Sequence, residues 1–170
     1  MNIRKAAAWL RRRAENFLVG LLAVMFVAFI VQIVFRYLFN FPIGWTSELS
    51  VITWLWLVLW GAAFVLKESE EIRFDLISGA AGSRTRRVMG IIIGISIVIL
   101  YAASLPATLA YVSFMKVEKT SYLKIRFDYL FSIYAIFAVA VIVRYLWILS
   151  HLVRGKDPEA LDSATVSSGL

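Results

Sequence analysis

Few residues of this chain are of a type that carries chemistry. Its 170 residues include no cysteine and a single histidine, His151. A thiolate nucleophile, a cysteine metal site and a disulfide are therefore excluded, and a b-type haem held between helices would normally need two facing histidines. The sequence also lacks a Gly-x-x-x-x-Gly-Lys-Ser/Thr phosphate loop. We therefore expect no enzyme activity and no metal, haem or other cofactor.

Ionisable side chains are also placed unfavourably for transport by this chain alone. Proton and ion carriers commonly hold an ionisable residue near the bilayer centre. Here Arg36 and Glu48 lie near the ends of long apolar runs, Arg144 lies near the end of another, and Gln32 is the strongly polar side chain well within a run. This pattern favours an accessory or scaffold protein over a catalyst or a carrier.

Four long apolar runs must position these residues, and they cover residues 17–35, 49–66, 88–115 and 129–150. A hydrocarbon core of roughly 30 Å is crossed by about 20 apolar residues in a helix. Hydrophobic residues make up 61% of the chain, which leaves little polar surface for a water-soluble fold. The sequence thus predicts an all-α integral membrane protein with four transmembrane helices. Residues 1–153 would form the membrane domain and residues 154–170 a flexible cytoplasmic tail.

The net charge of +7 is distributed along the chain in a way that predicts topology. Twelve Lys and Arg lie before the first run, between the second and third, and after the fourth, whereas five lie in the other two segments between runs. The positive-inside rule then places both termini in the cytoplasm. The cluster of Arg11, Arg12 and Arg13 would anchor the first span through anionic lipid headgroups, and we expect no nucleic acid partner.

Two short patterns near the predicted cytoplasmic side suggest packing elements. Ile72, Leu76 and Ile77 have the spacing of a short helix lying on the membrane surface, either as a connector or as a docking element for another subunit. Gly90 and Gly94 have the small-xxx-small spacing that lets helices approach closely. Either packing inside the bundle or a dimer seam fits this pair, and we favour packing inside the bundle.

The second span is rich in tryptophan, with Trp54, Trp56 and Trp60 followed by Gly61-Ala62-Ala63. Residues 56, 60 and 63 fall on one helical face by their spacing. That face could pack against a large partner, or it could rest in lipid or in the protein's own bundle. The spacing alone leaves these interpretations open.

A set of short motifs resembles one known family, the small membrane subunit (DctQ) of tripartite ATP-independent periplasmic (TRAP) transporters. The resemblance covers about residues 15–153. The motifs are Arg36-Tyr37, then Pro42, Trp45 and Glu48, then Trp60-Gly61-Ala62-Ala63. Two departures stand out: Ile72 and Asp75 are present without the His and Val that family members often carry beside them, and no proline precedes the fourth run.

The resemblance implies a function in a transporter of three components. The small subunit of such a system pairs with a larger multi-span membrane subunit that carries the substrate and sodium sites. A periplasmic binding protein delivers the solute, usually an organic acid. A multi-pass protein of the bacterial inner membrane is implied, which braces the large subunit during an elevator-type cycle. As residues at the subunit interface we hypothesise Arg36, Trp45, Glu48, Trp56, Trp60, Gly61 and Asp75.

Trp45 and Glu48 are one helical turn apart at the predicted outer start of the second span. Trp45 would fix the depth of the helix at the membrane interface. Glu48 would pair with Arg36 or with a cationic group of the large subunit. Alternatively, the Glu48 carboxylate would be stabilised simply by the dipole at the helix N-terminus.

The loop before the fourth run is basic against the positive-inside trend, because it carries Lys116, Lys119, Lys124 and Arg126. These cations either form a docking surface for an acidic patch of the binding protein or are solvated loop charges.

Three other classes of protein remain compatible with the sequence: a self-contained small carrier, a membrane anchor subunit of a redox complex, and an orphan structural protein. A carrier would transport alone in proteoliposomes, and a redox anchor would show a visible absorption band. A TRAP subunit would co-purify with a much larger multi-span protein.

Overall fold

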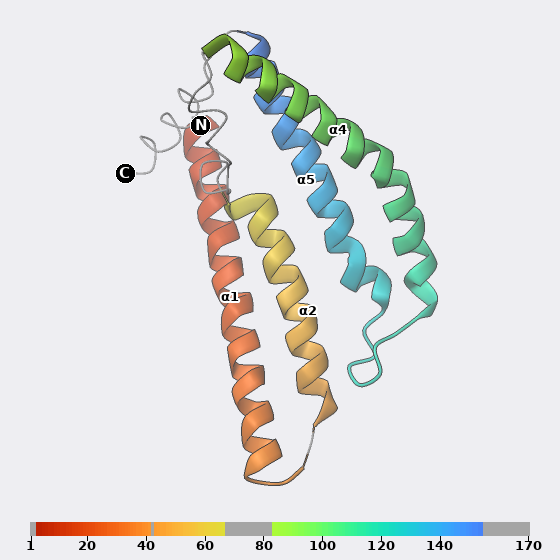
Figure 1. Cartoon of the computed structure of the whole chain (residues 1–170). Helices are drawn as coiled ribbons and strands as arrows, with labels where there is room; N and C mark the ends of the chain where they lie inside the picture. The colour runs from red at the N-terminus through yellow and green to blue at the C-terminus, as the bar shows by residue number, and fades with distance from the viewer. Residues whose placement is uncertain (1–2, 42, 67–82, 155–170) are drawn as a thin grey trace. The chain divides into compact units, whose positions relative to one another are not determined.

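The computed structural model describes residues 3–41, 43–66 and 83–154, which are mostly helical (Figure 1). The elements in chain order are α1 (Ile3–Tyr37), α2 (Gly44–Trp60), a π-helical turn η1 (Gly61–Val65), α4 (Ser83–Phe114), a 3₁₀ turn η3 (Met115–Val117) and α5 (Phe127–Val153). This confirms the predicted all-α fold. The predicted surface helix near Ile72, the interface residue Asp75 and most of the predicted tail lie outside the described residues.

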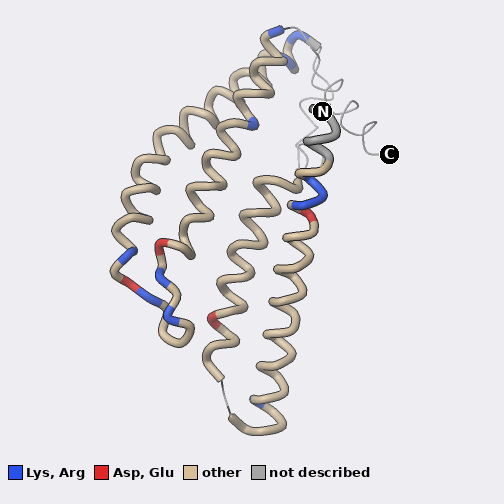
Figure 2. The backbone as a smooth tube through the Cα atoms, turned by 180° about the vertical axis from the view of Figure 1, so that it is seen from behind, with Lys and Arg blue, Asp and Glu red and all other residues tan. Residues whose placement is uncertain are grey.

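Within the described residues, four helices are long and apolar enough to cross a membrane: Trp9–Tyr37, Gly44–Val65, Arg87–Val117 and Phe127–Val153. Charged residues lie mostly toward the helix ends, with long uncharged stretches between them (Figure 2). Each of the four helices begins before the apolar run that predicted it. Helical hydrogen bonding satisfies backbone groups where water is absent, so a helix continues until the chain can turn in a polar environment.

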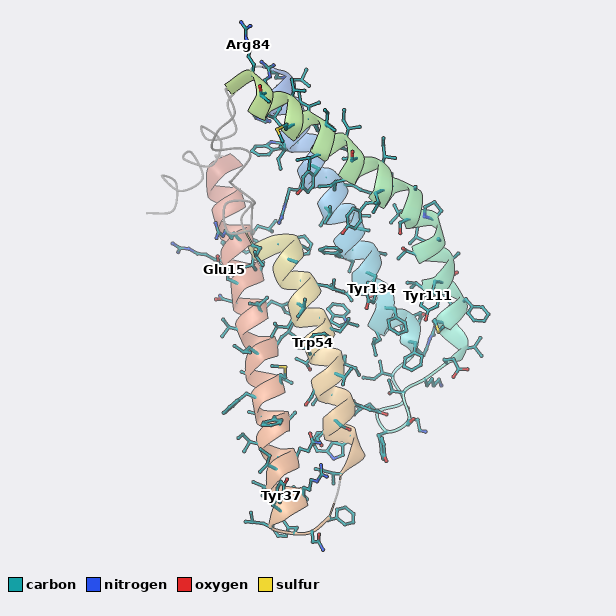
Figure 3. All side chains as sticks on the ribbon, viewed as in Figure 1. Glu15, Tyr37, Trp54, Arg84, Tyr111 and Tyr134 are labelled. Carbon is teal, nitrogen blue, oxygen red and sulfur yellow. The ribbon has the colours of Figure 1, made fainter. Side chains whose placement is uncertain are left out.

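The first of two compact units comprises Met1–Val65 and Ala107–Phe137. In it, α1 and α2 run side by side in opposite directions, joined by a short turn after Tyr37 (Figures 1 and 3). The turn contains Asn40 with a positive φ of 47°, and the backbone N–H of Phe41 donates to the Phe35 carbonyl over 3.0 Å. Asparagine tolerates this left-handed conformation better than most residues, which suits it to a tight reversal.

Two tryptophan side chains connect helices of the first unit. The Trp60 indole N–H of α2 donates to the Ala14 carbonyl of α1 over 3.3 Å, and the Trp56 indole N–H donates to the Leu130 carbonyl of α5 over 3.1 Å. The most buried hydroxyls of α2, on Thr46 and Thr53, donate to carbonyls of their own segment, Ile43 and Leu49. These contacts leave the buried polar groups of α2 paired.

The second unit comprises Leu66–Pro106 and Ala138–Leu170. Its described parts of α4 and α5 meet at the two glycines of α4. A Cβ atom at Gly90 would lie 3.7 Å from Leu152, and one at Gly94 would lie 3.0 Å from Leu149. The prediction that this pair serves packing inside the bundle is therefore confirmed.

Candidate functional site

The carboxylate of Glu48 on α2 is held by the backbone of the α4–α5 loop, which we define as residues 118–126. Its Oε1 accepts a hydrogen bond from the Tyr122 N–H and its Oε2 accepts one from the Leu123 N–H, each over 2.9 Å. Hydrogen bonds to an ionised acceptor are roughly twice as strong as neutral ones. We call this pair of bonds the Glu48 latch. It fastens a loop more than 70 residues away in the chain to the start of α2.

The loop has an internal structure that leaves these two N–H groups available. The Thr120 N–H donates to the Ile125 carbonyl over 2.9 Å, and the Ile125 N–H donates to the Thr120 hydroxyl over 3.0 Å. A further bond from the Phe127 N–H to the Glu118 carbonyl, over 3.1 Å, closes the base of the loop. Its tip turns through Lys124, which has a positive φ of 56°. The loop is therefore closed on itself, and the latch joins it to α2.

Gly44, the first residue of α2, completes the contact with the loop. A Cβ atom at this position would overlap the ring of Tyr122. Only glycine therefore allows the ring to lie this close to the helix backbone. Since Tyr122 also supplies one of the two N–H groups of the latch, a larger residue at position 44 would shift the loop away from Glu48.

The predicted pairing of Glu48 with Arg36 is not formed in the part of the chain that the structure describes, because the carboxylate is engaged by the loop backbone instead. The helix-dipole interpretation is also weakened. α2 begins at Gly44 rather than near residue 49, so Glu48 lies in the second turn of the helix. The dipole effect falls off beyond the first turn. Trp45 lies on the same helix, three residues earlier, and is 40% exposed.

The four loop cations are not equivalent in the structure. Arg126 forms a two-bond pair with Asp128, from Nε to Oδ1 over 3.1 Å and from Nη2 to Oδ2 over 2.7 Å. Its guanidinium group also lies 5.2 Å from the ring centre of Tyr129. Arg126 therefore stabilises the start of α5. Lys119 and Lys124 are exposed on the α4–α5 loop, and Lys116 is exposed on the 3₁₀ turn η3 just before it.

The tryptophan-bearing face of α2 packs within the chain at Trp56 and Trp60. Besides its bond to α1, Trp60 has its ring centre 4.7 Å from that of Phe17 and 4.6 Å from that of Phe64. Next to it, a Cβ atom at Gly61 would lie 3.0 Å from Leu18. Of the interpretations that the sequence left open, packing in the protein's own bundle therefore holds for these residues.

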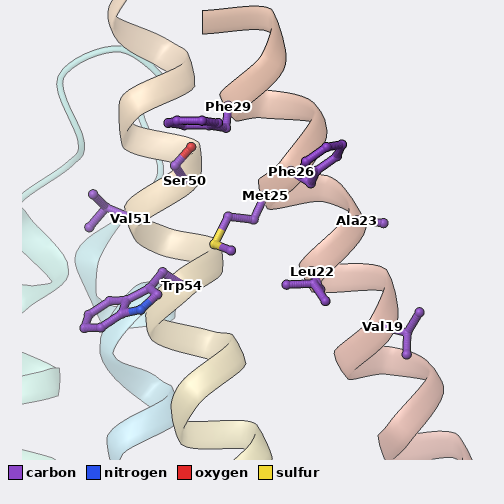
Figure 4. Close-up of a pocket in the computed structure, with 9 residues that line it drawn as sticks. All are labelled: Val19, Leu22, Ala23, Met25, Phe26, Phe29, Ser50, Val51 and Trp54. Atoms are coloured by element: carbon purple, nitrogen blue, oxygen red, sulfur yellow. The ribbon is translucent and has the colours of Figure 1, made fainter. Parts of the chain in front are cut away.

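An apolar groove between α1 and α2, with a volume of about 660 Å³, was not predicted from the sequence (Figure 4). Nine residues line it: Val19, Leu22, Ala23, Met25, Phe26, Phe29, Ser50, Val51 and Trp54. A signal was present, because five of the six α1 residues, at positions 19, 22, 23, 26 and 29, have the i, i+3, i+4, i+7 type of spacing that places residues on one helical face. Within a span that is apolar all round, however, this spacing does not distinguish a groove from a lipid-facing surface.

Trp54 differs from the other two tryptophans of α2 in its surroundings. Its side chain is 56% exposed, and its indole N–H donates to no acceptor among the described residues. In a helix, two residues correspond to a rotation of about 200°, so Trp54 and Trp56 lie on nearly opposite faces of α2.

The described residues also contain no group of three or more His, Cys, Asp or Glu side chains that could hold a metal ion.

Comparison with known proteins supplies the context for these features. The family model described as "Tripartite ATP-independent periplasmic transporters, DctQ component" matches residues 10–155, which include the latch, the groove and the loop. A curated relative, the C4-dicarboxylate TRAP transporter small permease protein DctQ of Vibrio cholerae serotype O1, is 32% identical over 79 residues. That match covers 46% of this chain and 34% of the relative, so it spans about a third of the relative's length.

Proposed function

The chain belongs to the DctQ family of TRAP transporter components, and from this membership we propose that it is the accessory membrane subunit of a binding-protein-dependent uptake transporter. In this proposal it lies in the bacterial inner membrane beside a larger multi-span subunit. That subunit carries the solute and the coupling ion, and this chain braces it while its transport domain moves.

The observation that carries the bracing role is that α2 is connected to three other segments of its unit. Glu48 binds the α4–α5 loop, Trp56 binds α5, and Trp60 binds α1. Interhelical hydrogen bonds in membranes stabilise by about 0.6 kcal/mol each on average. Several of them acting together favour a bundle that keeps its shape when a neighbour moves, which is what a stationary support requires.

The proposed solute is a small organic acid taken up with sodium, and the proposed third component is a periplasmic binding protein. The name of the Vibrio cholerae relative specifies C4-dicarboxylates for that protein. For this chain we propose only the wider class of organic acids, because the large subunit and the binding protein would select the solute.

Reconstitution in liposomes tests this function. Uptake should require this chain, the large subunit, the binding protein and a sodium gradient, and liposomes containing this chain alone should show no flux. Solute flux through the chain alone would identify a self-contained carrier, and a visible absorption band of the purified chain would identify a redox anchor. Either result would refute the proposed function.

For docking of the binding protein we propose the three exposed lysines Lys116, Lys119 and Lys124. The double variant Lys119→Glu/Lys124→Glu should raise the binding-protein concentration for half-maximal uptake several-fold, while the maximal rate stays unchanged. The effect should shrink as salt is added, because screening weakens contacts between exposed charges. As a control, Arg84→Glu reverses an exposed charge at the start of α4 (Figure 3). Equal effects of the two variants would refute the docking surface.

A further inference from the structure

We infer that the groove between α1 and α2 seats one transmembrane helix of the large membrane subunit, and that Trp54 donates its indole N–H to an acceptor on that helix. The identity of this partner rests on the proposed function. The observation that Trp54 has no acceptor comes from the described residues of this chain and does not depend on the proposed function.

The three tryptophans of α2 supply the first argument. Trp56 and Trp60 each donate to a backbone carbonyl of a neighbouring helix, over 3.1 and 3.3 Å. Trp54 points to a different side, where the described residues offer it no acceptor. An indole N–H placed in hydrocarbon without a partner is costly. Among the described residues, the Trp54 side of α2 therefore lacks a neighbour that accepts this hydrogen bond.

The depth of Trp54 argues that this neighbour is a protein rather than a lipid. Trp54 is ten residues from Gly44 and eleven from Val65, the ends of the membrane-spanning segment. About 15 Å of helix therefore separates it from either end. Tryptophan usually lies at the membrane–water interface, where headgroups and water satisfy its N–H. Near the centre of the bilayer an acyl chain offers no acceptor, whereas a helix offers side-chain oxygens or carbonyl groups.

The groove also has suitable dimensions for a helix. From Val19 to Phe29 it follows about 15 Å of α1, or nearly three helical turns. Two of its lining residues, Ala23 and Ser50, are small, which permits the close approach on which helix packing in membranes depends. The Ser50 hydroxyl already donates to the Thr46 carbonyl over 2.9 Å. Trp54 is therefore the lining side chain whose donor has no acceptor among the described residues.

These features define the chemistry of the occupant. It is an apolar helix that presents small residues to the groove and one hydrogen-bond acceptor at the depth of Trp54. The acceptor is the oxygen of a Ser, Thr, Asn or Gln side chain, or a carbonyl released by a proline or glycine in that helix.

Photo-crosslinking in the assembled complex tests the location. A photoreactive amino acid replaces Phe26, which lines the groove, or Val24, which is exposed on another face of α1 at nearly the same depth. Mass spectrometry then identifies the captured peptide. We expect position 26 to capture a transmembrane helix of the co-purified large subunit and position 24 not to capture it.

The variant Trp54→Phe tests the hydrogen bond, because it keeps a ring in the groove and removes the donor. Dissociation of the two subunits in detergent should become about threefold to twentyfold more favourable, the range expected for one interhelical bond in a membrane protein. Trp147→Phe changes an exposed tryptophan of α5 that does not line the groove, and it serves as the control. It should leave dissociation unchanged.

Several results would overturn the inference. Capture of lipid alone or of a second copy of this chain at position 26 would contradict it, as would capture of the large subunit at position 24 alone. Unchanged dissociation of the Trp54→Phe complex would refute the role of the indole N–H. These outcomes leave the proposed function intact. Failure of any large multi-span protein to co-purify would refute the proposed function, and the inferred partner with it.

Discussion

Replacement of Trp56 by phenylalanine should destabilise the chain by an amount that its hydrogen bond determines. The bond to the Leu130 carbonyl is 3.1 Å long and joins α2 to α5. Interhelical bonds in membrane proteins contribute about 0.6 kcal/mol on average and about 1.7 kcal/mol at most. Because the Leu130 carbonyl lies inside α5, where it also accepts within the helix, the variant leaves no unpaired acceptor. We therefore expect a threefold to twentyfold change in the unfolding equilibrium, since about 1.36 kcal/mol corresponds to a factor of ten.

The assay is an SDS titration of the purified chain in mild detergent micelles, with loss of tertiary structure followed by near-ultraviolet circular dichroism. Trp54→Phe is the matched control: it makes the same chemical change two residues away, where the indole N–H has no acceptor among the described residues. Trp56→Phe should unfold at a lower SDS fraction than the wild type, and Trp54→Phe at an unchanged one. Equal midpoints for the two variants would refute the view that Trp56 connects α2 to α5.

Three further predictions concern the latch and the glycines. Glu48→Gln should speed tryptic cleavage in the α4–α5 loop, because an amide oxygen accepts more weakly than a carboxylate and the NH₂ group cannot accept at all. Glu118→Gln changes an exposed carboxylate of the same loop and should leave the cleavage rate unchanged. Gly44→Ala should loosen the loop similarly by displacing the Tyr122 ring, and protection equal to wild type would contradict this contact. Gly94→Val should destabilise the chain by about 1–3 kcal/mol through overpacking, whereas Gly90→Ala has room for its methyl group and should be nearly neutral in the same SDS titration.

The sequence was sufficient to predict the helices because the length of an apolar run is a strong signal in a membrane protein. The starts and ends of the helices were less predictable. α2 begins at Gly44, whereas the apolar run begins at residue 49. The residues in between, among them Trp45 and the polar Thr46, are helical although they do not belong to the run. Hydropathy measures partition into lipid, whereas the bounds of a helix depend on where its backbone groups find partners.

The partner of Glu48 could not be predicted from residue types. Besides the helix dipole, we expected a cation as its partner, because carboxylates and guanidinium groups pair well and the sequence offered Arg36 nearby. The carboxylate instead binds two backbone N–H groups in a loop 74 and 75 residues away. Every residue except proline carries such a donor, so no pattern of side chains distinguishes Tyr122 and Leu123 from their neighbours. Only the fold brings them to Glu48.

The faces of α2 show why hydropathy does not orient a helix in a membrane. In water, the apolar face of a helix turns inward, so helical periodicity identifies the core. In lipid, inward and outward faces are equally apolar, and association depends on close packing and hydrogen bonds. The three tryptophans of α2 have the same hydropathy, yet two contact neighbouring helices and one borders the groove. What distinguishes them is the acceptor for each indole N–H. For Trp54, which has no acceptor among the described residues, we therefore infer that another chain packs on its side of α2.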